Sequence, residues 1–348
     1  MTGSIPELAS TTMARAAAVG LLVGLALVAA ACGVEEPPEL PPLRGGEPGE
    51  NRADTTADDP DVDPEPVDRS STHLMVELPE PTITILDLGA DPRRELRLNM
   101  VQGTEGLSTT RSRTVQQVFI DDAPASPETT TSNTVTIRAR VLEVADGVAT
   151  VERQFNDVAL VERGMMSPDD IAEFEDAMES MVGHSIFVAI DDRGTALRAE
   201  VPRDLPTELL GDHQDFVEGY SPSLPFPVEA VGVGARWQVD YPPMQAPTVP
   251  VTTVTEFELM ELHDDHVVMR VNVHTTIEAH SMEAHEGNIE FLDPEVHKRG
   301  TITRYFDAAG LESTTRTESI MGVIETVDDE RITTEVRQRL EVIATFES

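Results

Sequence analysis

The strongest constraint on the fold is an alternation of apolar and polar side chains with period two, which recurs from residue 73 onward. Clear examples lie at 96–100, 267–277 and 332–346. Successive side chains of a β-strand point to opposite faces, so this pattern predicts antiparallel strands with one buried and one hydrated face. We therefore expect residues 73–348 to form a mainly β domain, built as an antiparallel curved sheet or an open barrel.

One stretch departs from this alternation. The sequence "HSIFVAI" (184–190) is apolar at nearly every position. A strand of this composition has no face suited to water, so we expect neighbouring elements to cover it on both sides.

Two turn motifs occur twice, at nearly equal spacing along the chain. The pairs are "VLEVADGVATV" (141–151) with "LMELHDDHVVM" (259–269), and "AIDDRGTAL" (189–197) with "YFDAAGLES" (305–313). In the second pair we expect Gly194 and Gly310 to supply a positive φ at the end of the turn. The spacing favours two related β halves, 94–201 and 230–348, with Trp237 as a core anchor of the second. Independent convergence of hairpins is the alternative.

One amphipathic helix is expected over 167–182. Ser167 is a suitable N-cap, Pro168 suits the first turn, and Gly183 ends the helix. Between them an apolar stripe follows the helical period and consists of Ile171, Phe174, Met178, Met181 and Val182. We expect this stripe to pack on the sheet, although a methionine-rich binding groove is the alternative. The pattern at 204–220 predicts a second, weaker helix.

The first 31 residues have the features of an export signal. Arg15 precedes an uncharged apolar run at 16–31, which is shorter than the roughly 20 residues that span a bilayer. The small residues 29–31 lead directly into Cys32, the only cysteine of the chain. This stretch resembles the lipobox of bacterial lipoproteins, whose cysteine is acylated and becomes the mature N-terminus. The resemblance implies a lipid anchor on Cys32, and Gly33 after it points to the outer membrane.

Two other interpretations of the leader stay open. An ordinary secretory signal would leave Cys32 as a free thiol with no second cysteine to pair with. An uncleaved membrane anchor would need a longer apolar run. Translation could also start at Met13 instead of Met1, since a short leader beginning "MAR" is the more ordinary form.

The segment 32–72 is expected to be a disordered acidic linker. Residues 33–72 contain 12 acidic residues, 3 arginines and 8 prolines, with few large apolar side chains. Such a composition buries too little surface to offset the entropy of ordering, and its charges keep it extended. The run "DDPDVDP" (58–64) places carboxylates at alternating positions, but it lacks the glycine and the distal glutamate of an EF-hand. A solvated spacer is therefore preferred to a calcium site.

The formal net charge of −39 limits the partners of this protein. Nucleic acids and anionic headgroups are bound by basic patches, and the chain has a single lysine, Lys298. We therefore expect no nucleic acid partner. The low aromatic content of 4% also counts against a surface that stacks on carbohydrate.

Sequence motifs for catalysis are missing from the chain. It contains no G-x-S-x-G, H-E-x-x-H, P-loop or G-x-G-x-x-G sequence, so no catalytic residue and no cofactor are predicted. His263 and His266 flank two aspartates in a predicted turn, which is plausible zinc chemistry. However, His266, His274 and His280 are spaced too widely along one strand to share an ion. Solvated histidine is therefore preferred to a metal site.

The order of these features resembles an uncharacterised group of bacterial lipoproteins that carry a domain of unknown function. The shared elements are "LRLNMVQG", "VLEVADGVATV", the capped helix, "IFVAIDDRGTAL" and "PFPVEAVGVGARWQVDY", and they span about 94–345. The resemblance implies an antiparallel β domain and brings no catalytic residue with it.

From these features we expect a membrane-anchored, exported envelope protein with a structural or interaction role. Its partners would be the membrane, through acylated Cys32, and an envelope protein. The first alternative is a carrier or binder of a lipid or other hydrophobic ligand in a cavity under the helix. The second is a hydrolase with an unrecognised site.

Overall fold

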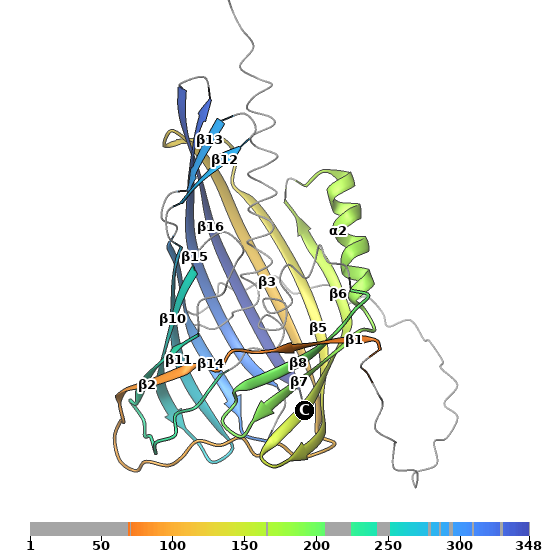
Figure 1. The fold of residues 1–348 in the computed structure, drawn as a ribbon, viewed down its shortest axis with the longest axis vertical. Helices are drawn as coiled ribbons and strands as arrows, with labels where there is room; N and C mark the ends of the chain where they lie inside the picture. Colours follow the sequence, from red (N-terminus) through yellow and green to blue (C-terminus); the bar gives the residue numbers. More distant parts are fainter. Residues whose placement is uncertain are drawn as a thin grey trace, which may run out of the picture.

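The computed structural model describes residues 69, 71–164, 166–205, 224–241, 251–277, 280–284, 287–291, 295–307, 310–327 and 330–347. Within these residues the chain forms one antiparallel sheet and one helix, which confirms the predicted mainly β fold (Figure 1). The predicted linker up to residue 68, Cys32 included, and most of the predicted weaker helix at 204–220 lie outside the described residues.

The N-terminal elements are β1 (His73–Glu77), β2 (Thr82–Asp87), β3 (Glu105–Ile120), β4 (Ala123–Pro124), β5 (Thr129–Ala145), β6 (Val148–Arg163), α2 (Pro168–Met181), β7 (Ser185–Asp191) and β8 (Ala196–Pro202). The C-terminal elements are β9 (Arg236–Asp240), β10 (Val251–Leu262), β11 (His266–Ile277), β12 (His280–Ala284), β13 (Gly287–Phe291), β14 (Glu295–Tyr305), β15 (Leu311–Val327) and β16 (Glu330–Glu347).

The strands pair in the order β1-β8-β7-β6-β5-β3-β16-β15-β14-β11-β10-β9-β2. Every pairing is antiparallel, and the β12–β13 hairpin joins the sheet through β15. From β1 to β3 the sheet contains the β7–β8 pair and then the β5–β6 pair. From β16 to β9 it contains the β14–β15 pair and then the β10–β11 pair, which is the same order of the repeated turn motifs. The β5–β6 and β10–β11 hairpins thus hold equivalent positions, as two related halves would require.

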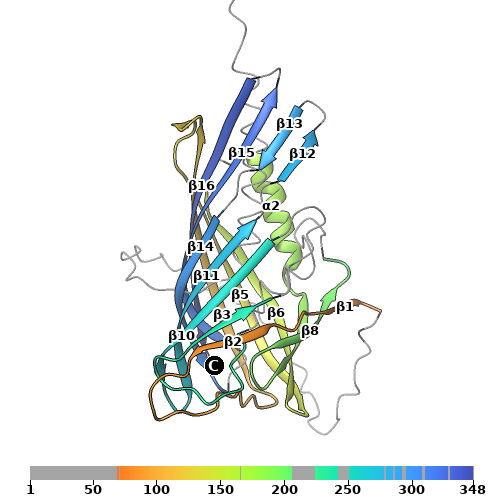
Figure 2. The same cartoon turned by 60° about the vertical axis from the view of Figure 1, so that its left-hand side comes forward.

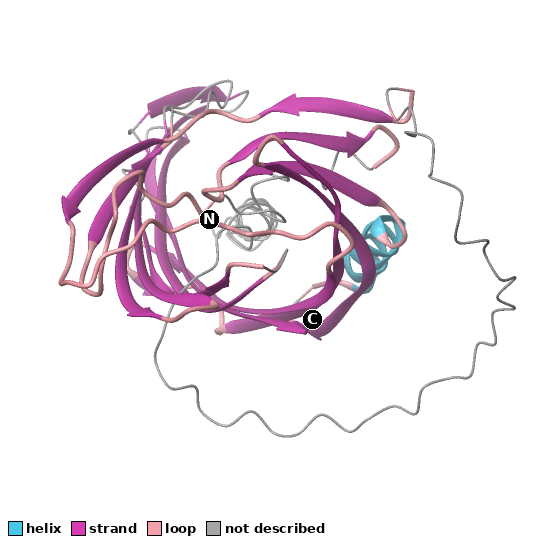
Figure 3. Cartoon of the chain, turned by 90° about the horizontal axis from the view of Figure 1, so that it is seen from below, coloured by secondary structure: helices cyan, strands magenta, loops and turns pink. Residues whose placement is uncertain are grey.

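The segment 73–87 bridges the two ends of this strand order. β1 and β2 stand at opposite ends of the sheet, yet only residues 78–81 separate them in the sequence. β1 pairs with β8, and β2 pairs with β9. Pro79 and Pro81 lack the N–H needed to continue either ladder, which lets the segment change partners between them. Seen from below, the strands form a ring (Figure 3), and the pairings of this segment close it.

The segment 95–100 was predicted as a strand, and that prediction is wrong. It is extended but lies outside the ladders, and it runs along the lower end of the sheet (orange in Figure 1). Its backbone is bonded to turns, with Leu98 N donating to Asp192 O (2.6 Å) and Asn99 N to Phe306 O (2.6 Å). The predicted buried face is correct, since Leu96, Leu98 and Met100 are at most 8% exposed.

The apolar core lies within the lower part of the ring. It draws on β5 to β8, on β9 to β11, and on the segment 95–100. Trp237 is fully buried, as predicted, and stacks on Phe257 with ring centroids 5.6 Å apart. The predicted alternation is confirmed in β11, where Val267, Met269 and Val271 are buried while Arg270 and Asn272 are exposed.

Two other burial predictions hold. In β16 the side chains Val336, Leu340, Val342 and Phe346 are buried on one face. In β7 both faces are covered, because Ile186, Val188, Ala189 and Ile190 are all buried.

The predicted helix is present as α2 and stands beside β6 (Figure 2). Met178 and Met181 are buried, Phe174 packs against the core cluster, and Val182 is 42% exposed just beyond the helix end. Ile171 N donates to Ser167 O in the first turn, and Gly183, predicted to end the helix, has a positive φ of 90°. Within the described part of the chain, no helix combines the length and apolar character that a membrane crossing requires.

The two predicted turn glycines differ. Gly194 has a φ of 85°, as predicted for the end of the β7–β8 turn. Gly310 does not have a positive φ, so that prediction is wrong. Glycine is needed at Gly310 for space, since a Cβ there would lie 2.0 Å from the Phe346 ring.

The folded part begins earlier than the predicted boundary at residue 73. Arg69, assigned to the linker from the sequence, lies 3.2 Å from Glu200 of β8, and its guanidinium carbon is 3.8 Å from the ring centroid of Phe187 in β7. The amides of Thr72 and His73 donate to its carbonyl.

Candidate functional site

The inner face of the ring is the first candidate site, because it carries buried polar side chains as well as the apolar core. The described buried positions of β15 bear hydroxyl groups, and β3 and β16 add polar side chains among their apolar ones. We call this set the hydroxyl wall, and it consists of Ser112, Ser313, Thr315, Thr317, Ser319, Thr334 and Gln338. Ser319 Oγ donates to Gln338 Oε1 (3.4 Å), and Thr315 Oγ1 donates to Val342 O (3.5 Å). The wall therefore offers donors and acceptors toward the interior.

Three basic side chains are also buried, and the sequence analysis missed them as a group. Lys298 and Arg304 lie on β14, and Arg153 lies on β6. Arg304 Nη1 donates to Gly310 O (2.8 Å). On β14 the bases occupy the same alternating positions as buried Val296 and Ile302. Continuing the period-two pattern through 295–305 would have found them.

Burial lowers the pKa of both arginines. The pKa of Arg153 falls to about 10 because burial penalises its charged form. The pKa of Arg304 falls to about 9, first through burial and then through the positive charge of Arg153. Both stay protonated at neutral pH, so the interior carries positive charge in a strongly acidic chain. Hydroxyl groups and cations together suit a polar or anionic group better than a hydrocarbon.

The β10–β11 turn is a second candidate, and it brings together two of the histidines considered from the sequence, His263 and His266. The His263 and His266 rings stack with centroids 4.3 Å apart, and His266 lies against Tyr305. His263 Nε2 is 2.8 Å from Glu261 Oε2, and His266 Nδ1 is 2.7 Å from Asp265 Oδ1. The His266 hydrogen bond lowers the pKa of Asp265 below its usual range.

This turn does not assemble a metal centre. Among the residues that the structure describes, no group of three or more His, Cys, Asp or Glu is placed to hold an ion. The turn is braced instead, because Arg94 donates to His263 O and lies 3.6 Å from Asp264. The side chain of His280 and the whole of His285 lie outside the described residues.

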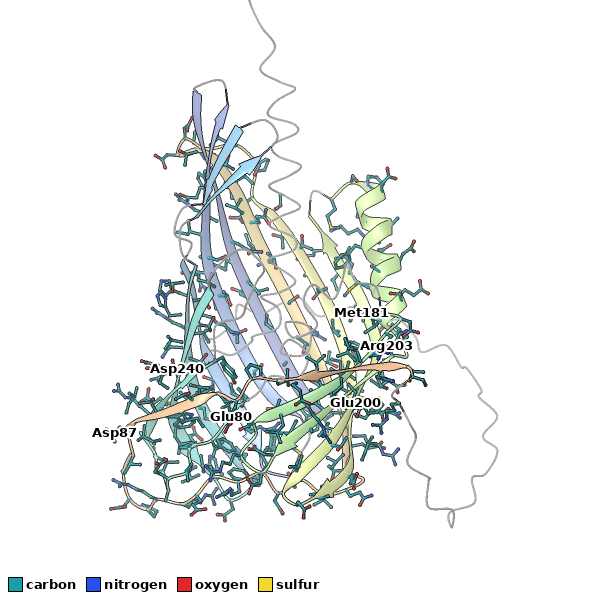
Figure 4. All side chains as sticks on the ribbon, in the orientation of Figure 1. Glu80, Asp87, Met181, Glu200, Arg203 and Asp240 are labelled. Carbon is teal, nitrogen blue, oxygen red and sulfur yellow. The ribbon has the colours of Figure 1, made fainter. Side chains whose placement is uncertain are left out.

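The outer face of the long strands is charged. Arg270 pairs with Glu258 across β10 and β11 (2.7 Å), and Arg316 pairs with Glu318 (3.0 Å). Further charges on β3, β14 and β16 are Arg111, Arg113, Arg299, Glu335, Arg337, Arg339 and Glu341. Figure 4 shows the described side chains as sticks on the ribbon. These charged outward positions suit contact with water.

Comparisons with known proteins add little. No family model matches the sequence, and no curated protein does. Among solved structures, a mutant porin of Rh. blastica shares 9% identity over 68% of this chain and 100% of its own, with a TM-score of 0.19. Pseudomonas aeruginosa OccK11 (OpdR) shares 6% identity over 71% of this chain and 98% of its own, with a TM-score of 0.20. Scores this low support no argument about function.

Proposed function

We propose that this protein is an exported lipoprotein of the bacterial cell envelope that acts by binding and not by catalysis. In this proposal acylated Cys32 tethers the chain to the outer membrane, residues 33–68 act as the spacer, and the β domain has a structural or interaction role.

The observation that carries the proposal is the charged outer face of the ring. Outward positions of β15 and β16 carry arginine and glutamate, among them Arg316, Glu318, Arg337 and Arg339, which suits a domain that stands in water. A domain of this kind needs a separate anchor to stay at a membrane. The lipobox-like sequence ending in Cys32 would supply that anchor, since several acyl chains on one residue bind far more firmly than one.

The packed core favours an interaction role over carriage of a hydrophobic ligand. Trp237, Phe226 and Phe155 are fully buried within the core cluster. Met178 and Met181 of α2 belong to the same cluster, so this helix packs as part of the apolar core. A carrier with a cavity under the helix would need those side chains to line open space.

Fractionation of cells tests the tether. We expect the wild-type chain to sediment with membranes and the Cys32→Ser variant to be released or poorly exported, without an acyl mass at its N-terminus. If the variant stays with membranes like wild type, the tether is wrong.

Mass spectrometry of an organic extract tests the binding role. We expect the purified β domain to carry no stoichiometric lipid. Recovery of one lipid per chain would favour the carrier and overturn the interaction role.

A further inference from the structure

The outer face of the sheet brings together two histidines that neither the turn nor the proposed tether involves. His274 of β11 and His297 of β14 are direct partners in the antiparallel register. Their Nδ1 atoms are 3.2 Å apart, and the rings stack with centroids 4.6 Å apart and an interplanar angle of 26°. Both side chains are exposed.

We propose that His274 and His297 form a two-histidine chelate for a late first-row divalent cation, such as Cu²⁺, Ni²⁺ or Zn²⁺. Imidazole nitrogen is a preferred ligand for these ions. Two nitrogens that each lie about 2.05 Å from one metal are separated by about 2.9 Å at a right angle and about 3.4 Å at the tetrahedral angle. The observed 3.2 Å falls between these limits.

The backbone and the exposed rings allow the binding geometry. Neighbouring strands hold directly opposed Cβ atoms about 4.5–5.5 Å apart, so the pairing of β11 with β14 sets the distance between the two rings. A histidine binds metal in its ring plane, and the broad χ2 torsion of an exposed side chain lets both planes turn toward one ion. The ring that carries its proton on Nδ1 moves it to Nε2 on binding, so both nitrogens coordinate as neutral imidazole.

Water completes the coordination shell in this proposal. Glu318 is the next partner across the sheet, opposite His297, but it already lies 3.0 Å from Arg316 and 3.7 Å from Arg339. We therefore leave it outside the site. The net charge of −39 raises the local concentration of cations around the whole molecule and favours capture of the ion.

The His263–His266 pair provides a matched control. Its rings stack at a similar distance, 4.3 Å, in the same sheet. Each ring, however, has a nitrogen bonded to a carboxylate of its own, Glu261 or Asp265. Both pairs are therefore stacked, and the Nδ1–Nδ1 contact of 3.2 Å is the feature of His274 and His297 that the comparison tests.

Copper titration of the full chain, purified in detergent without a histidine tag, tests the site. At pH 7.5 calorimetry should find one tight ion, and electron paramagnetic resonance should show coupling to two nitrogens. His274→Gln and His297→Gln should each weaken this binding about 100-fold, since linked ligands bind that much more tightly than either alone. The double variant measures background binding by carboxylates, and His263→Gln should match wild type.

Two outcomes would overturn the proposal. One is wild-type binding no tighter than that of the double variant. The other is an equal loss of affinity in His263→Gln.

Discussion

At the scale of single residues, close backbone approach explains several glycines. The loop before β9 runs against the loop after β2, with Gly232 N donating to Leu88 O and Ala90 N to Val233 O. A Cβ on Gly232 would lie 1.8 Å from Ala90 O. The obstacle is backbone, so it cannot rotate away.

We expect Gly232→Ala to reduce the free energy of unfolding by about 1–3 kcal/mol, the usual loss when added atoms force backbone shifts. Gly103→Ala is the control, since its Cβ would meet nothing within 4 Å. Its positive φ (87°) should still cost about 1 kcal/mol. Urea denaturation of both variants measures the difference, and equal losses would argue against the close approach.

The turn at β10–β11 gives a residue-scale pH effect. The hydrogen bond from His266 lowers the pKa of Asp265 below 3.8. The folded-state pKa is thus below the unfolded one, so the pair stabilises the fold above about pH 4 and loses that contribution as the pH falls through the folded pKa.

Nuclear magnetic resonance titration checks this shift directly. The Asp265 carboxyl should titrate below 3.8 in wild type and move back toward 3.8 in His266→Gln. An unchanged titration in that variant would assign the shift to the turn backbone.

At the scale of elements, α2 is joined to the sheet through one face. Met178 is 3% exposed, Phe174 is half-buried, and Val182 is 42% exposed. The sequence predicted all of them as one buried stripe. The last position differs because the helix ends at Met181, and Gly183 then turns the chain toward β7.

We expect Met178→Ala to lower the free energy of unfolding by about 2–5 kcal/mol, the range for truncating a buried methionine. Phe174→Ala should cost less than the roughly 3–5 kcal/mol of a fully buried phenylalanine, because its side chain is partly exposed. Val182→Ala should stay within about 0.5 kcal/mol of wild type. Chemical denaturation ranks the three, and a large loss at Val182 would contradict this packing.

At the scale of the whole molecule, the linker and the ring meet at Arg69. Its cation–π contact with Phe187 and its ion pair with Glu200 link the chain before β1 to β7 and β8. A spacer that buries nothing should be removable, provided that Arg69 is kept.

We therefore expect deletion of 35–66 to leave the Tm unchanged. Extending the deletion to 35–70 should lower it, because a cation–π contact and a partly exposed ion pair together contribute about 1–2 kcal/mol. Arg69→Ala in the otherwise intact chain should reproduce most of that loss. A lower Tm after the shorter deletion would show that the spacer packs on the ring.

The sequence by itself determined the local features of this protein. The period of two marked the buried faces of β11 and β16, and the composition of 184–190 marked a strand covered on both sides. The cap, stripe and glycine around α2 likewise located the helix. Each of these depends on neighbours a few residues apart, which is the range over which side-chain spacing and backbone preference act.

Only the tertiary structure decided which strands meet. No local pattern links β3 to β16, or joins β1 and β2 to opposite ends of the sheet, because pairing depends on register and on packing between distant segments. The same long-range choice places Gly310 against the ring of Phe346 and His274 opposite His297. The tertiary structure also explains why 95–100 is extended but not part of the sheet. Its apolar face packs in the core, and its backbone forms hydrogen bonds with turns and not with a neighbouring strand.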